Sequence, residues 1–348
     1  MGDVLIDAEK TGRATSGRAT SARTPLVHLV AAGAARDGGG HIGRMLALGE
    51  ALRDRRTALS FSIVGGRLGG EAARRATRLG LREGPSPSGA IVVVDLPRAA
   101  EAIDLAPADR LVVFDDGNAF GGEAAIVVQP SLPTWTGPGR GGHVLAGYAY
   151  APLARRYRDI RDQGPAAAPG GAHEANDPPL VLICFGGSDP ALVTERLAPS
   201  LAGIREDGPG WRVVAIVGAG HPGLTEISGI EILRDPPDLP EQLAAADLAI
   251  VGGGMMKFEA ACLRRPAILV AVADDQVAVG PPFASTGAAL WLGDGRSLDP
   301  AVLREAVGEL IREPWRRSAM AVRAGEVVDG RGADRLADAI LGLSADLP

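Results

Sequence analysis

Hydrophobic runs of strand length alternate with stretches of helical period from residue 26 onward. In the first part of the chain, the runs that predict strands are residues 26–35, 58–66, 90–95, 110–116 and 124–129. Residues 42–55 predict an amphipathic helix between the first two of them. Continuous Val, Ile and Leu runs separated by helices are typical of a parallel sheet covered on both faces, so this part is predicted to be an α/β unit.

The segment 161–179, RDQGPAAAPGGAHEANDPP, interrupts this periodicity and has the composition of a linker. The alternation then resumes, with apolar runs at residues 180–187, 211–220, 248–254, 267–272 and 288–294. Residues 299–343 are mostly helical in pattern. We predict two doubly wound α/β domains, residues 25–157 and 180–348, joined by a linker at 158–179. Ligands of such sheets bind at the carboxyl ends of the strands, so a cleft between the domains is the expected site.

Composition agrees with this fold class. A chain of 348 residues is long enough for about two domains, and 48 glycines with only 4% aromatic residues indicate many tight turns between short elements. A net charge of −6 argues against a general nucleic-acid or anionic-membrane surface, so an anionic substrate would need a local site. Cys184 and Cys262 lie in apolar and helical patterns, which predicts reduced thiols in a cytoplasmic protein.

Residues 1–24 differ from the rest of the chain. They contain the near-repeat GRATSGRATSAR and lack the continuous apolar region of a secretory signal, so we predict a disordered extension. A contact with a polyanion or a partner is the alternative. Nowhere in the sequence does an apolar run approach the roughly 20 residues that cross a bilayer.

A glycine turn, GGGHIGR at residues 38–44, follows the first predicted strand and opens the first helix. Glycines allow a sugar or phosphate to approach the backbone, and free N–H groups at a helix start favour an anion. His41 lies at the helix entry, where it could be a general base near neutral pH, or a structural residue of the turn. His28, inside the strand, is predicted to be a core histidine.

Two glycine turns in the second half have the same form. In CFGGSDP, residues 184–190, Gly186, Gly187 and Ser188 can donate backbone N–H groups. In VGGGMMKFEAA, residues 251–261, three glycines open a helix, and the carboxylate of Glu259 could accept the ribose hydroxyls of a nucleotide whose diphosphate lies at the helix start. A tight turn followed by a solvated glutamate is the alternative.

The stretch VVFDDGN, residues 112–118, places Asp115, Asp116 and Asn118 at a strand end. Paired acids can hold a metal, but a third ligand is not evident, and loop hydrogen bonds are the alternative. The spacing of His143, His173 and His221 does not predict a zinc site.

The motifs GGGHIGR, VVFDDGN, LAGYAYAPL, CFGGSDP, GGGMMKFEAA and ADDQ together resemble a known family over residues 26–325. This family contains the UDP-2,4-diacetamido-2,4,6-trideoxy-β-L-altropyranose hydrolase of pseudaminic acid biosynthesis and the related spore-coat polysaccharide proteins. The resemblance implies a two-domain GT-B fold. It also implies UDP held by the second domain, a sugar that projects toward His41, and neither metal nor cofactor. The family's tyrosine falls near Pro97, and its Asn-Gln pair falls at Asp275 and Gln276, so two positions expected around the sugar depart from the family pattern.

On these grounds the predicted catalytic residues are His41 and Asp275. The predicted substrate-binding residues are Gly39, Gly40, Arg44, Asp115, Tyr148, Gly186, Gly187, Ser188, Gly253, Gly254, Met255, Glu259 and Gln276. The expected ligand is a UDP-sugar, and the expected reaction is hydrolysis of its anomeric C–O bond with inversion. A glycosyltransferase that uses the same cleft, or a non-catalytic nucleotide-sugar binding protein, is the alternative.

Overall fold

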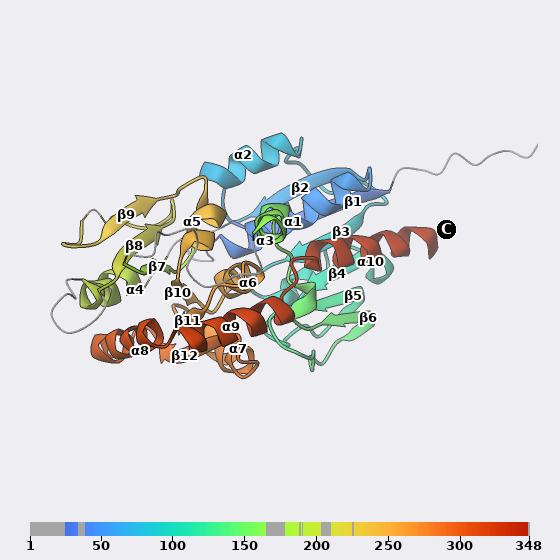
Figure 1. Ribbon diagram of the computed structural model, residues 1–348. Coiled ribbons are helices and arrows are strands. Elements are labelled where there is room, and N and C mark those ends of the chain that lie inside the picture. Colours follow the sequence, from blue (N-terminus) through green and yellow to red (C-terminus); the bar gives the residue numbers. More distant parts are fainter. Residues whose placement is uncertain are drawn as a thin grey trace, which may run out of the picture.

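The protein consists of two α/β halves, each built on a six-stranded sheet (Figure 1). The computed structural model describes residues 25–33, 39–164, 178–187, 189, 191–202, 210–224 and 226–346. All strand pairs in both sheets are parallel. The predicted fold class is therefore confirmed. Ser188 and residues 1–24 lie outside the described residues.

The first sheet has the strand order β2-β1-β3-β4-β5-β6. Its strands are β1 (Leu26–Ala32), β2 (Ala58–Val64), β3 (Ile91–Asp95), β4 (Leu111–Phe114), β5 (Glu123–Gln129) and β6 (Arg140–Ala146). Its helical elements are α1 (Gly40–Asp54), α2 (Gly70–Arg78) and the short 3-10 turns η2 (Ala99–Ala102), η3 (Ala108–Arg110) and η4 (Tyr148–Tyr150). His28 is 1% exposed and lies between the hydroxyls of Ser60 and Ser62, so its predicted core position is confirmed.

The second sheet has the order β12-β11-β10-β7-β8-β9. Its strands are β7 (Leu180–Cys184), β8 (Arg212–Val217), β9 (Glu231–Arg234), β10 (Leu248–Gly252), β11 (Ala267–Ala271) and β12 (Ala289–Asp294). Its helices are α4 (Val193–Leu197), α5 (Leu239–Ala245), α6 (Met255–Cys262), α7 (Asp274–Ala284), α8 (Pro300–Arg312) and α9 (Pro314–Val327), with the turn η5 (Ala198–Leu201). Both cysteines are buried and free.

Two edge strands, β6 and β9, are absent from the sequence prediction. An edge strand pairs on one side only and does not need a continuous apolar run. β6 has the sequence RGGHVLA and is largely exposed, and β9 has the sequence EILR. The other two edge strands, β2 and β12, were predicted because each carries an apolar run, ALSFSIV and ALWLGD. The remaining predicted strands are central strands, whose apolar side chains pack on both faces of the sheet.

Two helices connect the halves. α3 (Arg155–Gln163) follows the first half and packs against α5 and α6 of the second. α10 (Gly332–Asp346), at the end of the chain, returns to the first half and packs against α1 (Figure 1). Its residues Leu336 and Ile340 belong to the same apolar core as β1. The predicted domain boundaries remain a prediction, but α10 lies with the first half and the predicted linker begins inside α3.

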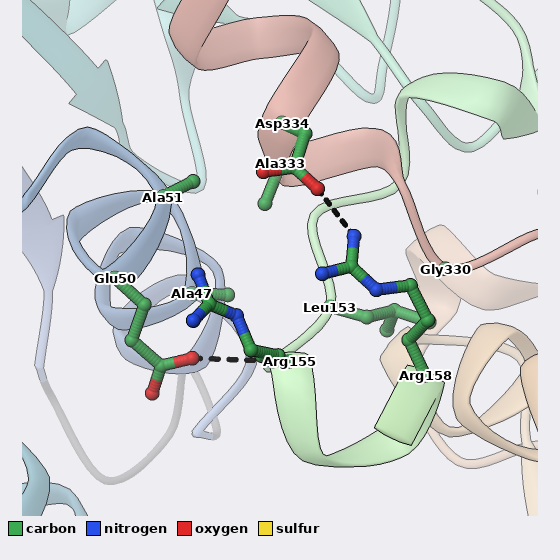
Figure 2. A pocket seen from close by; sticks show the side chains of 9 residues that line it. All are labelled: Ala47, Glu50, Ala51, Leu153, Arg155, Arg158, Gly330, Ala333 and Asp334. Atoms are coloured by element: carbon green, nitrogen blue, oxygen red, sulfur yellow. Dashed lines mark hydrogen bonds and ion pairs between the residues drawn. The ribbon is translucent and has the colours of Figure 1, made fainter. Parts of the chain in front are cut away.

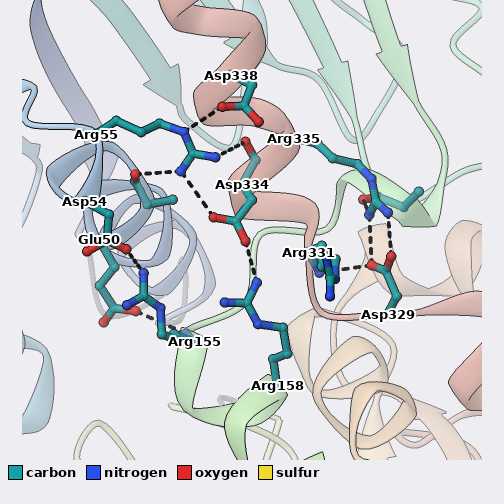
Figure 3. A network of polar contacts seen from close by, with 12 residues as sticks. Glu50, Asp54, Arg55, Arg155, Arg158, Asp329, Arg331, Asp334, Arg335 and Asp338 are labelled. Carbon is teal, nitrogen blue, oxygen red and sulfur yellow. Dashed lines mark hydrogen bonds and ion pairs between the residues drawn. The ribbon is translucent and has the colours of Figure 1, made fainter. Parts of the chain in front are cut away.

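Ion pairs join these elements on the side where α1, α3 and α10 meet (Figure 3). On α3, Arg155 pairs with Asp54 of α1, and Arg158 pairs with Asp334 of α10. Arg55 also pairs with Asp334, at 3.2 Å. The small pocket in Figure 2 is lined by residues of this junction and by none of the predicted site residues. In the described part of the chain, the helices are all too short or too polar to cross a membrane.

Candidate active site

Glycine turns from the two halves meet where the carboxyl ends of the two sheets face each other. A Cβ atom built on Gly187, after β7, would lie 3.2 Å from the nitrogen of Gly39, which precedes α1. A Cβ atom on Gly40 would lie 3.7 Å from Cγ of Met255, the first residue of α6. Gly186 has φ +96°, in the left-handed region that favours glycine. The structure therefore brings these predicted residues together, although they are far apart in the sequence.

His41 is paired with a buried carboxylate. Its Nδ1 lies 2.7 Å from Oδ1 of Asp95, which is 1% exposed, whereas the His41 side chain is 15% exposed. Asp95 ends β3 and is the register partner of Ala31 in the neighbouring strand β1, after which the glycine turn follows. A proton on Nδ1 that is donated to Asp95 leaves Nε2 unprotonated. The pair thus has the orientation that a general base requires.

Arg44 holds this pair from one helical turn further along α1. Its Nε and Nη2 donate to the two carboxylate oxygens of Asp95 at 2.8 and 2.6 Å, and its Nη1 donates to Asp116. Burial lowers the pKa of Arg44, but Asp116 and Asp95 outweigh it and raise the value. Burial raises the pKa of Asp116, but Arg44 and a hydrogen bond from Ser131 lower it below its usual range. Both groups are therefore charged.

The two neighbouring acids after β4 have different contacts. The carboxylate of Asp115, predicted to bind substrate, accepts the backbone N–H groups of Ala119 at 2.9 Å and Phe120 at 3.0 Å, and the indole N–H of Trp135 at 2.6 Å. It is 1% exposed. These are the loop hydrogen bonds of the alternative hypothesis, and the acid that reaches the Arg44 network is Asp116.

In the second half, Gln276 ties the glycine turn to the adjacent strand. Its Oε1 accepts the N–H of Gly253 at 2.9 Å and the N–H of Val272 at 3.1 Å. A Cβ atom on Gly253 would lie 3.0 Å from Cβ of Gln276, so the turn has no room for a side chain there. Because the Gly253 N–H is already used, the donors for an anion are those at the start of α6. Asp275, in the first turn of α7, is exposed.

Glu259, on α6, faces Tyr157 of α3. Burial raises the pKa of Glu259 to about 7, although a hydrogen bond with Tyr157 and the charge of Arg75 lower it. The ring of Tyr148 packs against Phe258 and Phe283, at centroid distances of 6.1 and 5.1 Å. Its buried hydroxyl has no hydrogen-bond partner within the described part of the chain. The roles assigned to Glu259 and Tyr148 from the sequence stay predictions.

Asp95, Asp116 and Lys257 are not among the site residues predicted from the sequence. Asp95 ends a buried strand that lies next to the strand leading into the His41 turn. Only the order of the strands in the sheet could have identified it as a partner of His41. Asp116 was considered only as part of an acid pair. Lys257 is the one charged residue in the stretch VGGGMMKF, which is a detectable signal, and its side chain is 1% exposed.

A group of potential metal ligands also occurs among the described residues, formed by Asp189, Glu195 and His221. The two oxygens of Asp189 accept N–H groups of Val193 and Thr194. Nδ1 of His221 accepts backbone N–H groups, and its Nε2 lies 3.2 Å from Glu195. The imidazole proton is then on Nε2, the atom that faces the acids, so the group is satisfied by hydrogen bonds.

Comparison with known proteins gave partial matches in sequence. No family model matches the chain. The spore coat polysaccharide biosynthesis protein SpsG of Bacillus subtilis (strain 168) is 24% identical over 166 residues, 45% of this chain and 48% of SpsG. The UDP-N-acetylglucosamine--N-acetylmuramyl-(pentapeptide) pyrophosphoryl-undecaprenol N-acetylglucosamine transferase of Methylorubrum extorquens is 30% identical over 177 residues, 46% of this chain and 47% of the relative. The chain spans about half the length of the curated relatives it matches.

Matches to solved structures cover nearly the whole chain. MurG of Acinetobacter baumannii superimposes with a TM-score of 0.57 at 16% identity, over 91% of this chain and 99% of that one. The calicheamicin glycosyltransferase CalG4 gives a TM-score of 0.59 at 16% identity, over 94% and 100%. At this identity the likeness concerns the fold. The chain has the GT-B fold of these glycosyltransferases, as its motifs predicted.

Proposed function

We propose that the protein is a glycosyltransferase that moves a sugar from a UDP-sugar to an acceptor hydroxyl, with His41 as the general base. The observation that carries the proposal is the His41–Asp95 pair, at 2.7 Å, on the glycine turn that meets the turns of the second half. The names of the transferase relatives support transfer over the hydrolysis that the motifs predicted. Both reactions need UDP on the second half and a base on the first.

The proposed step assigns a separate task to each half. Nε2 of His41 takes the proton of the acceptor hydroxyl while that oxygen attacks the anomeric carbon. The bond between the anomeric carbon and the phosphate oxygen breaks, and UDP leaves with its electron pair. N–H groups at the start of α6 and at Gly187 stabilise the departing diphosphate. Asp95 stabilises the imidazolium that forms, and Arg44 is a positioning residue for Asp95.

Hydrolysis of a UDP-sugar is the second candidate function. It is supported by the motif order GGGHIGR to CFGGSDP and by the partial match to the spore coat protein SpsG. In this case water takes the place of the acceptor hydroxyl and His41 has the same role. The two buried free cysteines support a cytoplasmic location for either enzyme.

The experiment is to measure UDP release from a panel of UDP-sugars with and without acceptors. The panel includes UDP-N-acetylglucosamine and UDP-2,4-diacetamido-2,4,6-trideoxy-β-L-altropyranose, and the acceptors include sugars and lipid-linked sugars. A transferase should release UDP slowly until an acceptor is added, whereas steady release of UDP and free sugar without any acceptor would establish the hydrolase instead.

The matched variants are His41→Gln and His143→Gln. Loss of the base should lower turnover by about 10² to 10⁴ while UDP binding persists. His143 lies on the exposed edge strand β6, so its replacement should leave turnover unchanged. Equal turnover in both variants would remove His41 from the proposed mechanism.

A further inference from the structure

Lys257 is a buried basic residue at a position that does not favour a cation. It is the third residue of α6, its side chain is 1% exposed, and it lies three residues after the last glycine of the turn. A positive charge near a helix N-terminus is disfavoured by the helix dipole, and burial adds a desolvation cost. Something in the site must therefore offset the charge or remove it.

The surroundings of Lys257 offset the charge only in part. Its Nζ donates to the carbonyl of Gly253 at 2.7 Å, which is its single hydrogen bond among the described residues. An ammonium group has three N–H donors, so two of them have no acceptor among the described residues. The rings of Phe258 and Phe283 lie below Nζ, with centroids 4.7 and 5.8 Å away.

Charged groups reach Lys257 from three other elements. Asp116, from the loop after β4, and Asp275, from α7, favour the ammonium, whereas Arg44, from α1, disfavours it. Asp116 is already paired with Arg44 and Ser131. The nearby phenol of Tyr148, which packs on Phe258 and Phe283, is neutral because burial raises its pKa to about 12.

The choice of residue is informative as well. The chain contains 36 Lys and Arg residues, and only Lys10 and Lys257 among them are lysines. Arginine remains charged in proteins, whereas a buried lysine can lose its proton. Lys257 is thus the one lysine among the described residues, and it lies close to the glycine turn that opens α6.

We propose that Lys257 takes up a proton from solvent when a nucleoside diphosphate binds at the glycine turn, so that its ammonium neutralises part of the ligand charge. The inference rests on the proposed function, because it needs UDP at the start of α6. In the free protein, burial lowers the pKa of Lys257 to about 7 from its ordinary 10.5. Above neutral pH the free amine is therefore mostly uncharged, and an adjacent diphosphate favours the charged form.

The direct test is NMR of the full-length protein labelled with ¹³Cε lysine, titrated with base in the presence and absence of UDP. Only two side-chain signals arise, and Lys257→Met assigns them. Without UDP, the Lys257 signal should titrate near neutral pH, and saturating UDP should move its midpoint upward by at least about one pH unit. An unmoved midpoint with UDP bound would overturn the inference.

Calorimetry provides the second test, in buffers with different ionisation enthalpies at about one pH unit above neutral. Each UDP that binds should be accompanied by the uptake of at most about one proton. The Kd for UDP should therefore rise by at most tenfold per pH unit, until the amine of the complex also titrates. Uridine, which has no phosphate, should bind without this uptake. Lys257→Arg keeps the charge, so its UDP binding should lack the proton uptake that residue 257 contributes, and any remaining pH dependence belongs to other groups such as Glu259.

The outcomes separate the two proposals. If UDP does not bind the wild-type protein at all, the proposed function fails and this inference fails with it. If UDP binds and the proton uptake is undiminished in Lys257→Arg, another group carries the proton and only this inference is wrong. If Lys257→Met lowers the melting temperature but binds UDP with the same affinity and proton count as the wild type, the lysine serves the contact between the halves.

Discussion

The two glycine turns, one from each half, hold charge in different ways. At the first glycine turn, the buried pair Asp95 and Arg44 and the partly exposed Asp116 form a chain of ion pairs in which each charge has a partner of the opposite sign. At the second turn, the polar groups are backbone N–H donors, the amide of Gln276 and the amine of Lys257, which has a single acceptor in the described region. The first arrangement keeps His41 in one orientation, whereas the second can respond to the charge of a ligand.

Within the second half, α6 has two ionisable groups that burial affects in the same way. Lys257 and Glu259 are two residues apart, and burial moves the pKa of both to about 7, from 10.5 and 4.5. In each case burial favours the neutral form. The helix that is proposed to hold the nucleotide therefore has two groups that change charge near neutral pH, and the first half has a network that stays charged.

The largest expected effect concerns the first glycine turn, where the charges are paired. Asp95→Asn should lower turnover by about 10² to 10⁴, because the amide cannot stabilise the imidazolium or select the Nδ1–H tautomer. UDP affinity, measured by calorimetry, should not change. Asp109→Asn, at an exposed acid of the same half, is the control. Equal turnover in the two variants would mean that the pair has no role in the chemistry.

Replacement of Arg44 tests whether the ion pairs stabilise the first half. Arg44→Met leaves Asp95 buried without its guanidinium partner, so we expect a loss of roughly 3 to 5 kcal/mol in the free energy of unfolding. Urea denaturation measures it. Arg53→Met, on the exposed face of the same helix, should cost far less. A loss no greater than that of the control would show that Asp95 and Asp116 do not depend on Arg44.

The nucleotide side should respond through binding rather than through folding. If Glu259 accepts the ribose hydroxyls, Glu259→Ala should weaken UDP by roughly 1.5 to 3 kcal/mol, as expected for hydrogen bonds to a charged group. Calorimetry with the folded variant measures this, and Glu305→Ala, at an exposed position of α8, is the control. An unchanged UDP affinity would remove Glu259 from the site and leave it as the partner of Tyr157.

The smallest effects are pH dependences of stability, of which the first comes from Lys257. Its pKa in the folded state, about 7, lies below its ordinary value of 10.5, so the unfolded chain binds more protons between these values. The free energy of unfolding should therefore rise with pH, by roughly 1 kcal/mol between about pH 7 and about pH 8. Lys257→Met should lack this contribution. The same slope in both proteins would show that the lysine is not buried as described.

Glu259 has the opposite sign in a lower pH range. Its folded-state pKa, about 7, lies above its ordinary value of 4.5, so the folded protein binds more protons between these values. Stability should fall as pH rises through this range. Urea denaturation of the wild type and Glu259→Gln over these pH values checks the sign, and a wild-type slope no more negative than that of the variant would contradict it.

Much of the fold follows from local patterns in the sequence. The central strands of both sheets are continuous apolar runs, because they are covered on both faces, and their approximate positions could be predicted. The glycine turns could also be located, because a close approach of two backbones, as at Gly39 and Gly187, requires residues without side chains. The edge strands β6 and β9 and the return of α10 to the first half have no comparable local signal.

The sequence by itself determined the two α/β halves, their glycine turns and the presence of a histidine at the first turn. Tertiary structure decided which residues act with it. Asp95 reaches His41 because β3 lies beside β1 in the sheet. Asp116 rather than Asp115 meets Arg44, because the carboxylate of Asp115 is held by backbone N–H groups of its own loop. Spacing along the chain is set by covalent geometry, whereas contacts across 50 or more residues depend on strand order and packing, which no short stretch of sequence contains.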